Sequence, residues 1–158
     1  SSVNVFICNK NNILKTLTKL NEYGEVLLEK YIPGREIQVA ILENKVLGAI
    51  ELRPTRKFYD YQAKYNPKAR TEHIIPVEIS KRKYQELTKI ALKAHKILNC
   101  RGVTRSDFRY YKNSFYLLET NTQPGMTSLS LVPEIANFNN ITFKNLIKKI
   151  LKDASINK

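Results

Sequence analysis

The sequence predicts an α+β fold built on a largely antiparallel sheet, and three observations point to it. Two pairs of strand-like segments are each joined by a short polar turn, which is the pattern of antiparallel hairpins. Residues 81–98 and 143–151 repeat apolar side chains at the spacing of amphipathic helices. The chain has 158 residues, of which 42% are hydrophobic, and this is enough to fill one core. Hairpins mixed with helices in this way favour the α+β class.

The first half of the chain is expected to begin with a helix over residues 10–20, where leucines recur at helical spacing. A short apolar run at residues 26–31 has the composition of a strand. Residues 37–42 and 46–52 predict two further strands, and the polar turn between them indicates a hairpin. Residues 53–76 are polar and irregular, and a loop of this length is usually functional or disordered.

The second half of the chain continues with the two helices named above, which Ser80 and Thr142 are expected to cap. Between the helices, residues 102–109 and 114–121 predict two more strands. Residues 122–140 again read as irregular. The second hairpin and the irregular segment after it hold most of the residues that suggest chemistry.

The charge of the chain is strongly basic, because 27 Lys and Arg residues stand against 14 acidic ones and give a formal net charge of +13. One interpretation is a solvated basic surface on a piece of a larger protein. The other is attraction of polyanions, either nucleotide phosphates or nucleic acid. Net charge does not separate these two. The only methionine, Met126, lies deep in the chain, so we expect a fragment or a processed product.

The sequence favours a cytoplasmic protein with no membrane partner. No run reaches 18 apolar residues, and the N-terminus has no basic-then-apolar signal pattern. Cys8 and Cys100 form neither a disulfide framework nor a metal-ligand cluster, which fits a reducing compartment. His73 and His95, in an expected loop and helix, have no carboxylate or cysteine at ligand spacing, so both are expected to be non-catalytic.

The most informative chemistry lies in the second hairpin. Residues i and i+2 of a strand share a face, so Arg105 lies beside Asp107, and Glu119 lies beside Asn121. Folding the hairpin about Asn113 places Asp107 opposite Glu119 and Arg105 opposite Asn121. The four side chains then converge on one face of the sheet.

Two carboxylates facing each other across a hairpin repel, and a cation between them would relieve the repulsion. Carboxylate and amide oxygens suit a hard ion, and Mg²⁺ is the natural choice where phosphate oxygens complete its shell. The alternative is an exposed strand face on which Arg105 neutralises one acid, because the register is uncertain by one residue. Phe108, Phe115 and Leu117 are expected to form the opposite, apolar face of the hairpin.

The segment after this hairpin, residues 122–130, is rich in small and hydroxyl side chains and contains Gly125. Such a segment can turn backbone N–H groups toward an anion. A metal pair, an arginine and a donor loop in one place are typical of a phosphoryl-transfer site.

At this point the chain resembles the D-alanine–D-alanine ligase family of the ATP-grasp superfamily. Residues 119–127 read E-T-N-T-Q-P-G-M-T and are similar to the family motif E-x-N-T-x-P-G-M-T, which residues 128–133 continue. Residues 58–65 resemble its F-Y-D-Y-x-A-K-Y loop. Further matches are residues 102–107 with G-x-x-R-x-D, residues 29–36 with the adenosine-binding stretch, and residues 1–3 with the end of a glycine-rich loop.

The resemblance implies a reaction in which two D-alanines are joined through an acyl-phosphate, with ATP and two Mg²⁺ ions as cofactors, Mn²⁺ being an alternative. The metal ligands that it implies are Asp107, Glu119 and Asn121. The implied catalytic residues are Arg105 and Gly125, which stabilise the oxyanion, and Tyr65 and Ser1, which help close the loop over the site.

The resemblance also implies how substrate and nucleotide are bound. Lys64 would pair with a phosphate or the substrate carboxylate, and Ser130 with the backbone of Leu131 would bind the carboxylate of the second D-alanine. The implied ATP contacts are Glu29, Lys30 and Ile32 at adenine, Glu36 at the ribose, and Phe58 and Leu118 against the adenine ring. Without the resemblance, each of these would read as an ordinary surface charge or core residue.

Two positions depart from the family pattern. Asn4 replaces the second glycine of the phosphate loop, and asparagine tolerates a positive φ better than most residues. Leu129 stands between the two serines of residues 128–130, where many members have histidine, which argues against an imidazole role there.

The resemblance further implies that residues 1–32 end the central ATP-grasp subdomain and that residues 33–158 form the C-terminal domain. The first D-alanine and part of the ATP would be held by a missing N-terminal part of the same protein, so the fragment is expected to be inactive alone. A full-length protein would be a homodimer. The alternatives are another ATP-grasp carboxylate–amine ligase and a basic nucleic-acid-binding module. Scattered basic residues and clustered acids argue against nucleic acid.

Overall fold

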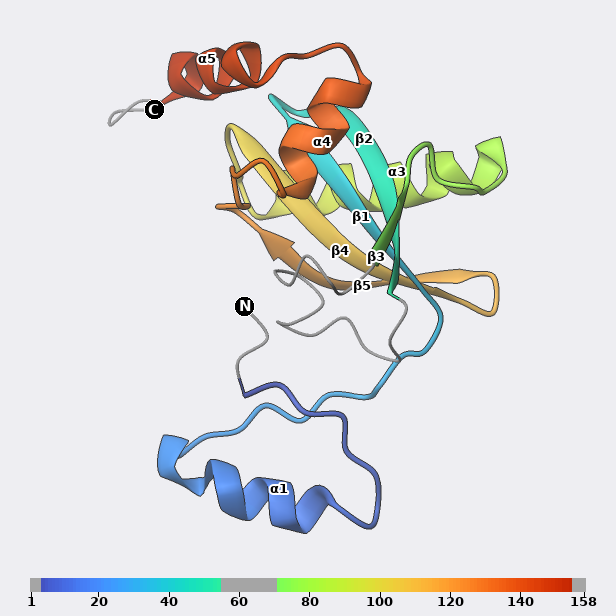
Figure 1. Ribbon diagram of the computed structural model, residues 1–158, viewed down its shortest axis with the longest axis vertical. Helices are drawn as coiled ribbons and strands as arrows, with labels where there is room; N and C mark the ends of the chain where they lie inside the picture. Colours follow the sequence, from blue (N-terminus) through green and yellow to red (C-terminus); the bar gives the residue numbers. More distant parts are fainter. Residues whose placement is uncertain (1–3, 55–70, 155–158) are drawn as a thin grey trace. The chain divides into compact units, whose positions relative to one another are not determined.

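A computed structural model describes residues 4–54 and 71–154, and these residues fall into two compact units (Figure 1). The first unit includes the described residues up to Ile32. The second comprises Pro33–Arg53 and the described chain from Glu72 onward. The contacts therefore divide the chain after Ile32, while the assignment of the two parts to ATP-grasp subdomains stays a prediction. No helix among the described residues has the length and apolar character needed to cross a membrane.

The first unit contains helix α1, Ile13–Leu20, and the 3-10 helix η1, Asn21–Tyr23. The helix confirms the leucine spacing of the sequence, although Leu20 alone is buried within it. The strand expected at residues 26–31 is wrong. A strand needs a hydrogen-bonded neighbour, and this run has none among the described residues, so Leu27 and Leu28 lie exposed.

The second unit is built on a five-stranded sheet in the order β3-β2-β1-β4-β5 (Figure 1). Antiparallel pairing joins β1 to β2, β1 to β4 and β4 to β5, so the largely antiparallel sheet predicted from the sequence is confirmed. The strand bounds are β1 Arg35–Leu42, β2 Lys45–Pro54, β3 Thr71–Ile74, β4 Val103–Tyr111 and β5 Ser114–Asn121.

Helices cover both faces of this sheet (Figure 1). Helix α3, Lys81–Ile97, packs Leu87 and Ala91 against the core residues Ile37 and Phe108. Side chains alternate along a strand, so the face of β1 opposite Ile37 carries Glu36, Gln38 and Ala40. We call the face that carries Ile37, on which α3 packs, the covered face. We call the face that carries Glu36 the site face.

Both predicted helix caps are present. The Ser80 hydroxyl accepts a hydrogen bond from the backbone N–H of Lys83 at 3.3 Å, and the Thr142 hydroxyl accepts one from Asn145 at 3.3 Å. Each cap satisfies a backbone donor that the first helical turn leaves unpaired. The last helix, α5, spans Phe143–Asp153, as its periodicity predicts.

Two elements correct the expectation of irregular structure. Strand β3 lies within the stretch that was expected to be a loop, and helix α4, Leu131–Phe138, lies within residues 122–140. Pro133 falls in the first turn of α4, where a missing N–H costs no hydrogen bond. Close approach of α4 to β2 depends on Gly48, because a Cβ there would lie 2.7 Å from Cγ2 of Ile135.

Candidate functional site

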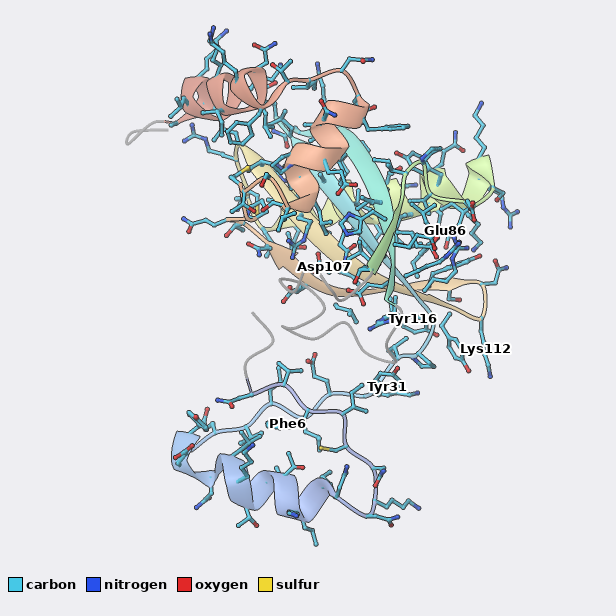
Figure 2. All side chains as sticks on the ribbon, in the orientation of Figure 1. Phe6, Tyr31, Glu86, Asp107, Lys112 and Tyr116 are labelled. Atoms are coloured by element: carbon cyan, nitrogen blue, oxygen red, sulfur yellow. The ribbon has the colours of Figure 1, made fainter. Side chains whose placement is uncertain are left out.

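The register of the second hairpin confirms the predicted pairing of its acids. Asp107 lies opposite Glu119, and Arg105 lies opposite Asn121. Asp107 is in the middle of β4, well away from the turn that carries Lys112 (Figure 2). The hairpin therefore places both carboxylates, the arginine and the amide on the site face.

This pairing is achieved differently from the simple fold about Asn113. Tyr111 pairs with Ser114, so the turn has two residues, both with positive φ, Lys112 at 46° and Asn113 at 64°. Such a turn alone would place Asp107 opposite Leu118. A register shift between Asp107 and Phe108 inserts one extra residue in β5 and brings Glu119 to the Asp107 position. Bulges of this kind often re-aim a side chain near a functional site.

The opposite face of the hairpin carries Phe108, Phe115 and Leu117 as predicted, but it is only partly buried. Phe108 is fully buried, and it pairs with Leu117 on β5. Leu117 is nevertheless 41% exposed, because β5 is the edge strand of the sheet. Phe115 stacks on Tyr110, with ring centroids 4.5 Å apart.

Arg105 and Asp107 form a bidentate ion pair on the site face. The Arg105 Nε donates to Oδ1 of Asp107 at 2.7 Å, and a terminal nitrogen donates to Oδ2 at 3.0 Å. Their side chains are 16% and 14% exposed, respectively, so the pair is well shielded but still reachable. A carboxylate offers about four acceptor positions, so pairing with Arg105 leaves Asp107 able to act as a metal ligand as well.

Glu36 on β1 lies on the same face, where Arg109 and Gln38 contact its carboxylate. Arg109, its cross-strand partner on β4, approaches Oε2 of Glu36 at 3.1 Å, and Nε2 of Gln38 donates to Oε1 at 3.1 Å. Arg109 also donates to the backbone carbonyl of Gly34 at 3.2 Å. Gln38 pairs across the sheet with Asp107, so the Glu36 and Asp107 groups are neighbours on one surface.

Sequence analysis missed Arg109 and Gln38, although one signal was present. Gln38 is a polar residue inside an apolar strand, at the i+2 position from Glu36. It is 1% exposed, and its Oε1 is buried without a hydrogen-bond partner among the described residues. Buried polar atoms without partners are uncommon and call for a specific reason.

The loop after β5 brings two predicted residues together. A Cβ on Gly125 would lie 2.8 Å from the hydroxyl oxygen of Ser130, so only glycine allows this approach without a shift. The Ser130 hydroxyl accepts a hydrogen bond from the backbone N–H of Thr127 at 2.9 Å. Leu131 follows as the first residue of α4, and its backbone N–H belongs to the turn that has no intrahelical acceptor.

The donor set of the hairpin fits a magnesium ion by its chemistry. Asp107 and Glu119 supply two carboxylates, and the Oδ1 of Asn121 supplies an amide oxygen, which also accepts from the backbone N–H of Gln123 at 2.9 Å. Within residues 4–54 and 71–154, no three His, Cys, Asp or Glu side chains are grouped closely enough to hold a metal. The hairpin offers two carboxylates and one amide oxygen, a donor set that would suit a metal whose shell is completed by phosphate oxygens.

The remaining predicted residues are placed as follows. Leu118 is half-exposed on β5, in the middle of the register shift. Glu29 and Lys30 are exposed and Ile32 is partly buried in the first unit. Ser1, Phe58, Lys64 and Tyr65 lie outside the described residues. Asn4 has a φ of 60°, the positive value that asparagine was expected to tolerate in place of glycine.

The histidines are only partly as expected. His73 lies on β3 rather than in a loop, and its Nδ1 is 2.7 Å from Oε2 of Glu134, so it does have a carboxylate neighbour. That neighbour is 61 residues away in the sequence and comes close only through the fold. His95 is fully buried on α3, with its Nδ1 2.8 Å from the Thr104 hydroxyl. Burial lowers the pKa of His95, which keeps it neutral.

The chain matches the family described as D-ala D-ala ligase C-terminus over residues 1–152. It is 64% identical over 158 residues to a D-alanine–D-alanine ligase of Pelagibacter ubique, covering all of this chain and 52% of that relative. A D-alanine–D-alanine ligase of Paramagnetospirillum magneticum is 41% identical over 160 residues, with 98% and 52% covered. The chain thus spans about half the length of these curated relatives.

Solved structures agree with the sequence matches. A crystal structure of D-alanine–D-alanine ligase from Bacillus anthracis superposes with a TM-score of 0.82 at 34% identity, covering 97% of this chain and 50% of that one. A second structure of the ligase from the same organism, complexed with ATP, gives a TM-score of 0.78 at 28% identity, with 92% and 46% covered.

The sheet topology and the paired carboxylates with their arginine define an ATP-grasp ligase domain of α+β class. More particularly, the chain belongs to the family of D-alanine–D-alanine ligase C-terminal domains.

Proposed function

We propose that this chain is the C-terminal part of a cytoplasmic enzyme that uses ATP and Mg²⁺ to join two D-alanines through an acyl-phosphate, for peptidoglycan precursor synthesis. The observation that carries the proposal is the register that sets Asp107 opposite Glu119, beside Arg105 and Asn121. Family membership and the 64% identity to the Pelagibacter ubique ligase support the choice of reaction.

In this proposal Asp107, Glu119 and Asn121 hold Mg²⁺, with Mn²⁺ as a substitute, and the metal when bound neutralises charge on the ATP phosphates. Arg105 lies within reach of the same oxygens, because it already pairs with Asp107 at 2.7 Å. Its fixed guanidinium, together with the backbone N–H of Gly125, stabilises the oxyanion formed when the second amine attacks.

The second D-alanine is proposed to bind through its carboxylate at the start of α4. The hydroxyl of Ser130 and the backbone N–H of Leu131 are the donors, and Gly125 keeps the space beside Ser130 open. The first helical turn favours an anion because its N–H groups point outward and carry partial positive charge.

The nucleotide contacts remain part of the proposal. Glu36 takes the ribose, and Lys64 takes a phosphate or the substrate carboxylate. A related chain was solved with ATP bound, which supports nucleotide binding in this family. The other proposed contacts are Glu29, Lys30, Ile32, Phe58 and Leu118 around adenine, with Tyr65 and Ser1 in loop closure.

The chain covers about half of its relatives, so the proposed enzyme needs the rest of the same protein. We assign to that part the grip on the first D-alanine and on the far side of ATP. Residues 1–32 are proposed to belong to the central subdomain and residues 33–158 to the C-terminal domain. The full-length protein is proposed to be a homodimer, and the 158-residue chain alone is expected to release no phosphate in response to D-alanine.

The test is D-alanine-dependent phosphate release by the full-length protein carrying Asp107→Asn or Glu119→Gln. Each is expected to reduce turnover by about 100-fold or more, the scale of losing a group that stabilises transition-state charge. Glu86→Gln is the matched control, because Glu86 pairs with Lys83 on α3, the helix that packs on the face of the sheet opposite the hairpin acids. Near-normal turnover in both hairpin variants would remove the metal assignment.

A further inference from the structure

We propose that Arg109 and Gln38 are positioning residues that fix the carboxylate of Glu36 for recognition of a neutral vicinal diol, the ribose of the nucleotide. The inference rests on the proposed function for the identity of the ligand. We call the contacts of Arg109 and Gln38 with the Glu36 carboxylate the clamp. Sequence analysis named Glu36 but neither of the two residues that hold it.

The clamp holds each oxygen of the Glu36 carboxylate by a different residue. Arg109 takes Oε2 at 3.1 Å, and Gln38 takes Oε1 at 3.1 Å. The second terminal nitrogen of Arg109 donates to the carbonyl of Gly34 at 3.2 Å, which ties the guanidinium to the start of β1. With both oxygens held and the arginine itself anchored, the carboxylate is fixed in one orientation.

The charges of the clamp select the kind of ligand. The side chains of Glu36 and Arg109 are both 14% exposed, so their charges largely offset each other in a shielded place. A cationic ligand would be repelled by Arg109, and an anionic ligand would be repelled by Glu36. A diol carries no charge and donates hydrogen bonds, and a carboxylate, with about four acceptor positions, can take them in addition to those from its neighbours.

The spacing of the clamp along the sheet fits a nucleotide. Gln38 lies opposite Asp107, the proposed metal ligand, and Glu36 is two residues further along β1. Two residues of a strand span about 7 Å. A sugar at Glu36 and phosphates near Asp107 therefore lie about as far apart as the parts of one nucleotide.

The buried amide of Gln38 supports a functional reason for the clamp. Its Nε2 serves Glu36, while its Oε1 is buried with no hydrogen-bond partner in the described part of the chain. The reverse orientation would set its oxygen against the carboxylate. A residue that only filled space would not leave a polar atom buried in this way, because an apolar side chain would avoid the cost.

The test measures binding of ATP and of 2′,3′-dideoxyATP, which lacks both hydroxyls, by calorimetry on the full-length protein with Mg²⁺. The wild type is expected to prefer ATP by about tenfold or more, the value of hydrogen bonds to a charged group. Arg109→Met should reduce this preference to nearly one, mainly by weakening ATP binding. Arg109→Lys should restore part of it. Arg101→Met is the matched control, since Arg101 pairs with Asp153 of α5 and precedes the end of β4 that pairs with Leu42, at the opposite end of β1 from Glu36.

A second readout needs no nucleotide. The side-chain NH₂ of Gln38 should exchange slowly with solvent in the wild type, and Glu36→Ala should accelerate the exchange at least tenfold. Unchanged exchange would overturn the clamp.

Two binding outcomes separate the inference from the proposed function. If Arg109→Met weakened the binding of ATP and of dideoxyATP equally, the inference would be overturned, because Arg109 would then act on the phosphates or on the fold. Failure of the wild type to bind either nucleotide would instead overturn the proposed function.

Discussion

The two faces of the sheet use charged groups in different ways. On the covered face, Glu51 is fully buried between Arg35 and Arg53, with hydrogen bonds of 2.8 Å from Arg35 and 3.1 Å from Arg53. On the site face, Glu36 pairs with Arg109 and Asp107 pairs with Arg105, and both acids remain 14% exposed. Arg35 and Glu36 are consecutive residues of β1, so their side chains point to opposite faces of the sheet, and one strand contributes a residue to each group of ion pairs.

The difference between the faces is one of accessibility. Burial opposes the charge of Glu51, but the hydrogen bonds from its two arginines outweigh burial and lower its pKa. Arg53 also reaches Glu78 at 2.9 Å, which extends the network toward the start of α3. A fully buried and doubly paired acid has no room for a ligand, so its contribution is to the stability of β1 and β2. The site-face acids keep the partial exposure that a ligand requires.

The largest expected effect is on stability, at Glu51. Glu51→Gln removes the charge from two hydrogen bonds inside the sheet, and should lower the free energy of unfolding by about 2–3 kcal/mol. Glu36→Gln, the matched change on the site face, should cost less, about 1 kcal/mol, because the side chain of Glu36 is 14% exposed whereas that of Glu51 is fully buried. Urea unfolding of both variants measures the difference. Equal losses would mean that the two faces do not divide stability and binding as described.

The next largest expected effect is on the pH dependence of the free energy of unfolding, and it concerns His95, a buried neutral group on the covered face. His95 has a folded-state pKa that burial lowers below its ordinary value near 6.5. The unfolded chain therefore binds this proton first as pH falls, so stability is complete above about pH 6.5 and is lost toward the lower folded pKa. One such proton contributes at most about 1.4 kcal/mol per pH unit.

The variant His95→Gln should flatten this dependence, because glutamine can still meet the Thr104 hydroxyl and does not titrate. The measurement is the free energy of unfolding between pH 7.5 and pH 5 for both proteins. Parallel curves would show that His95 is not the group that titrates.

The smallest expected effect is on the free energy of unfolding when Glu119 is substituted. It lies opposite Asp107 in the register, so without bound metal the two carboxylates repel. Glu119→Gln should change stability by about 0 to 0.5 kcal/mol in the stabilising direction in a metal-chelating buffer. Asp107→Asn is the contrast, because it also breaks the ion pair with Arg105 and should destabilise the protein. A destabilising Glu119→Gln would show that repulsion between the acids is unimportant.

Local sequence patterns determined much of this molecule. Hairpin turns, strand alternation and the caps Ser80 and Thr142 are decided within a few residues, where backbone geometry and hydrogen bonding act directly. The same rules placed Asp107 opposite Glu119. They reached the correct pair through a single symmetric turn, whereas the protein combines a two-residue turn with an extra residue at Leu118.

Patterns that depend on distant partners were decided only by the tertiary structure. The apolar run at residues 26–31 predicted a strand but has no ladder among the described residues, while β3 forms from polar residues because β2 offers it an edge. Helix α4 is short and begins near a proline, and it is stabilised by burial of Val132 and Ile135, the second of which lies against Gly48.

The Arg109–Glu36 pair joins residues 73 positions apart, and the sheet order brings them side by side. The sequence around either residue does not predict this contact, because the spacing of the strands along the chain does not determine which strands will be neighbours. The sequence by itself determined the face of the hairpin that bears the acids. The tertiary structure decided which residues of β1 lie beside them, because strand pairing across long loops depends on burial of the whole core rather than on any one turn.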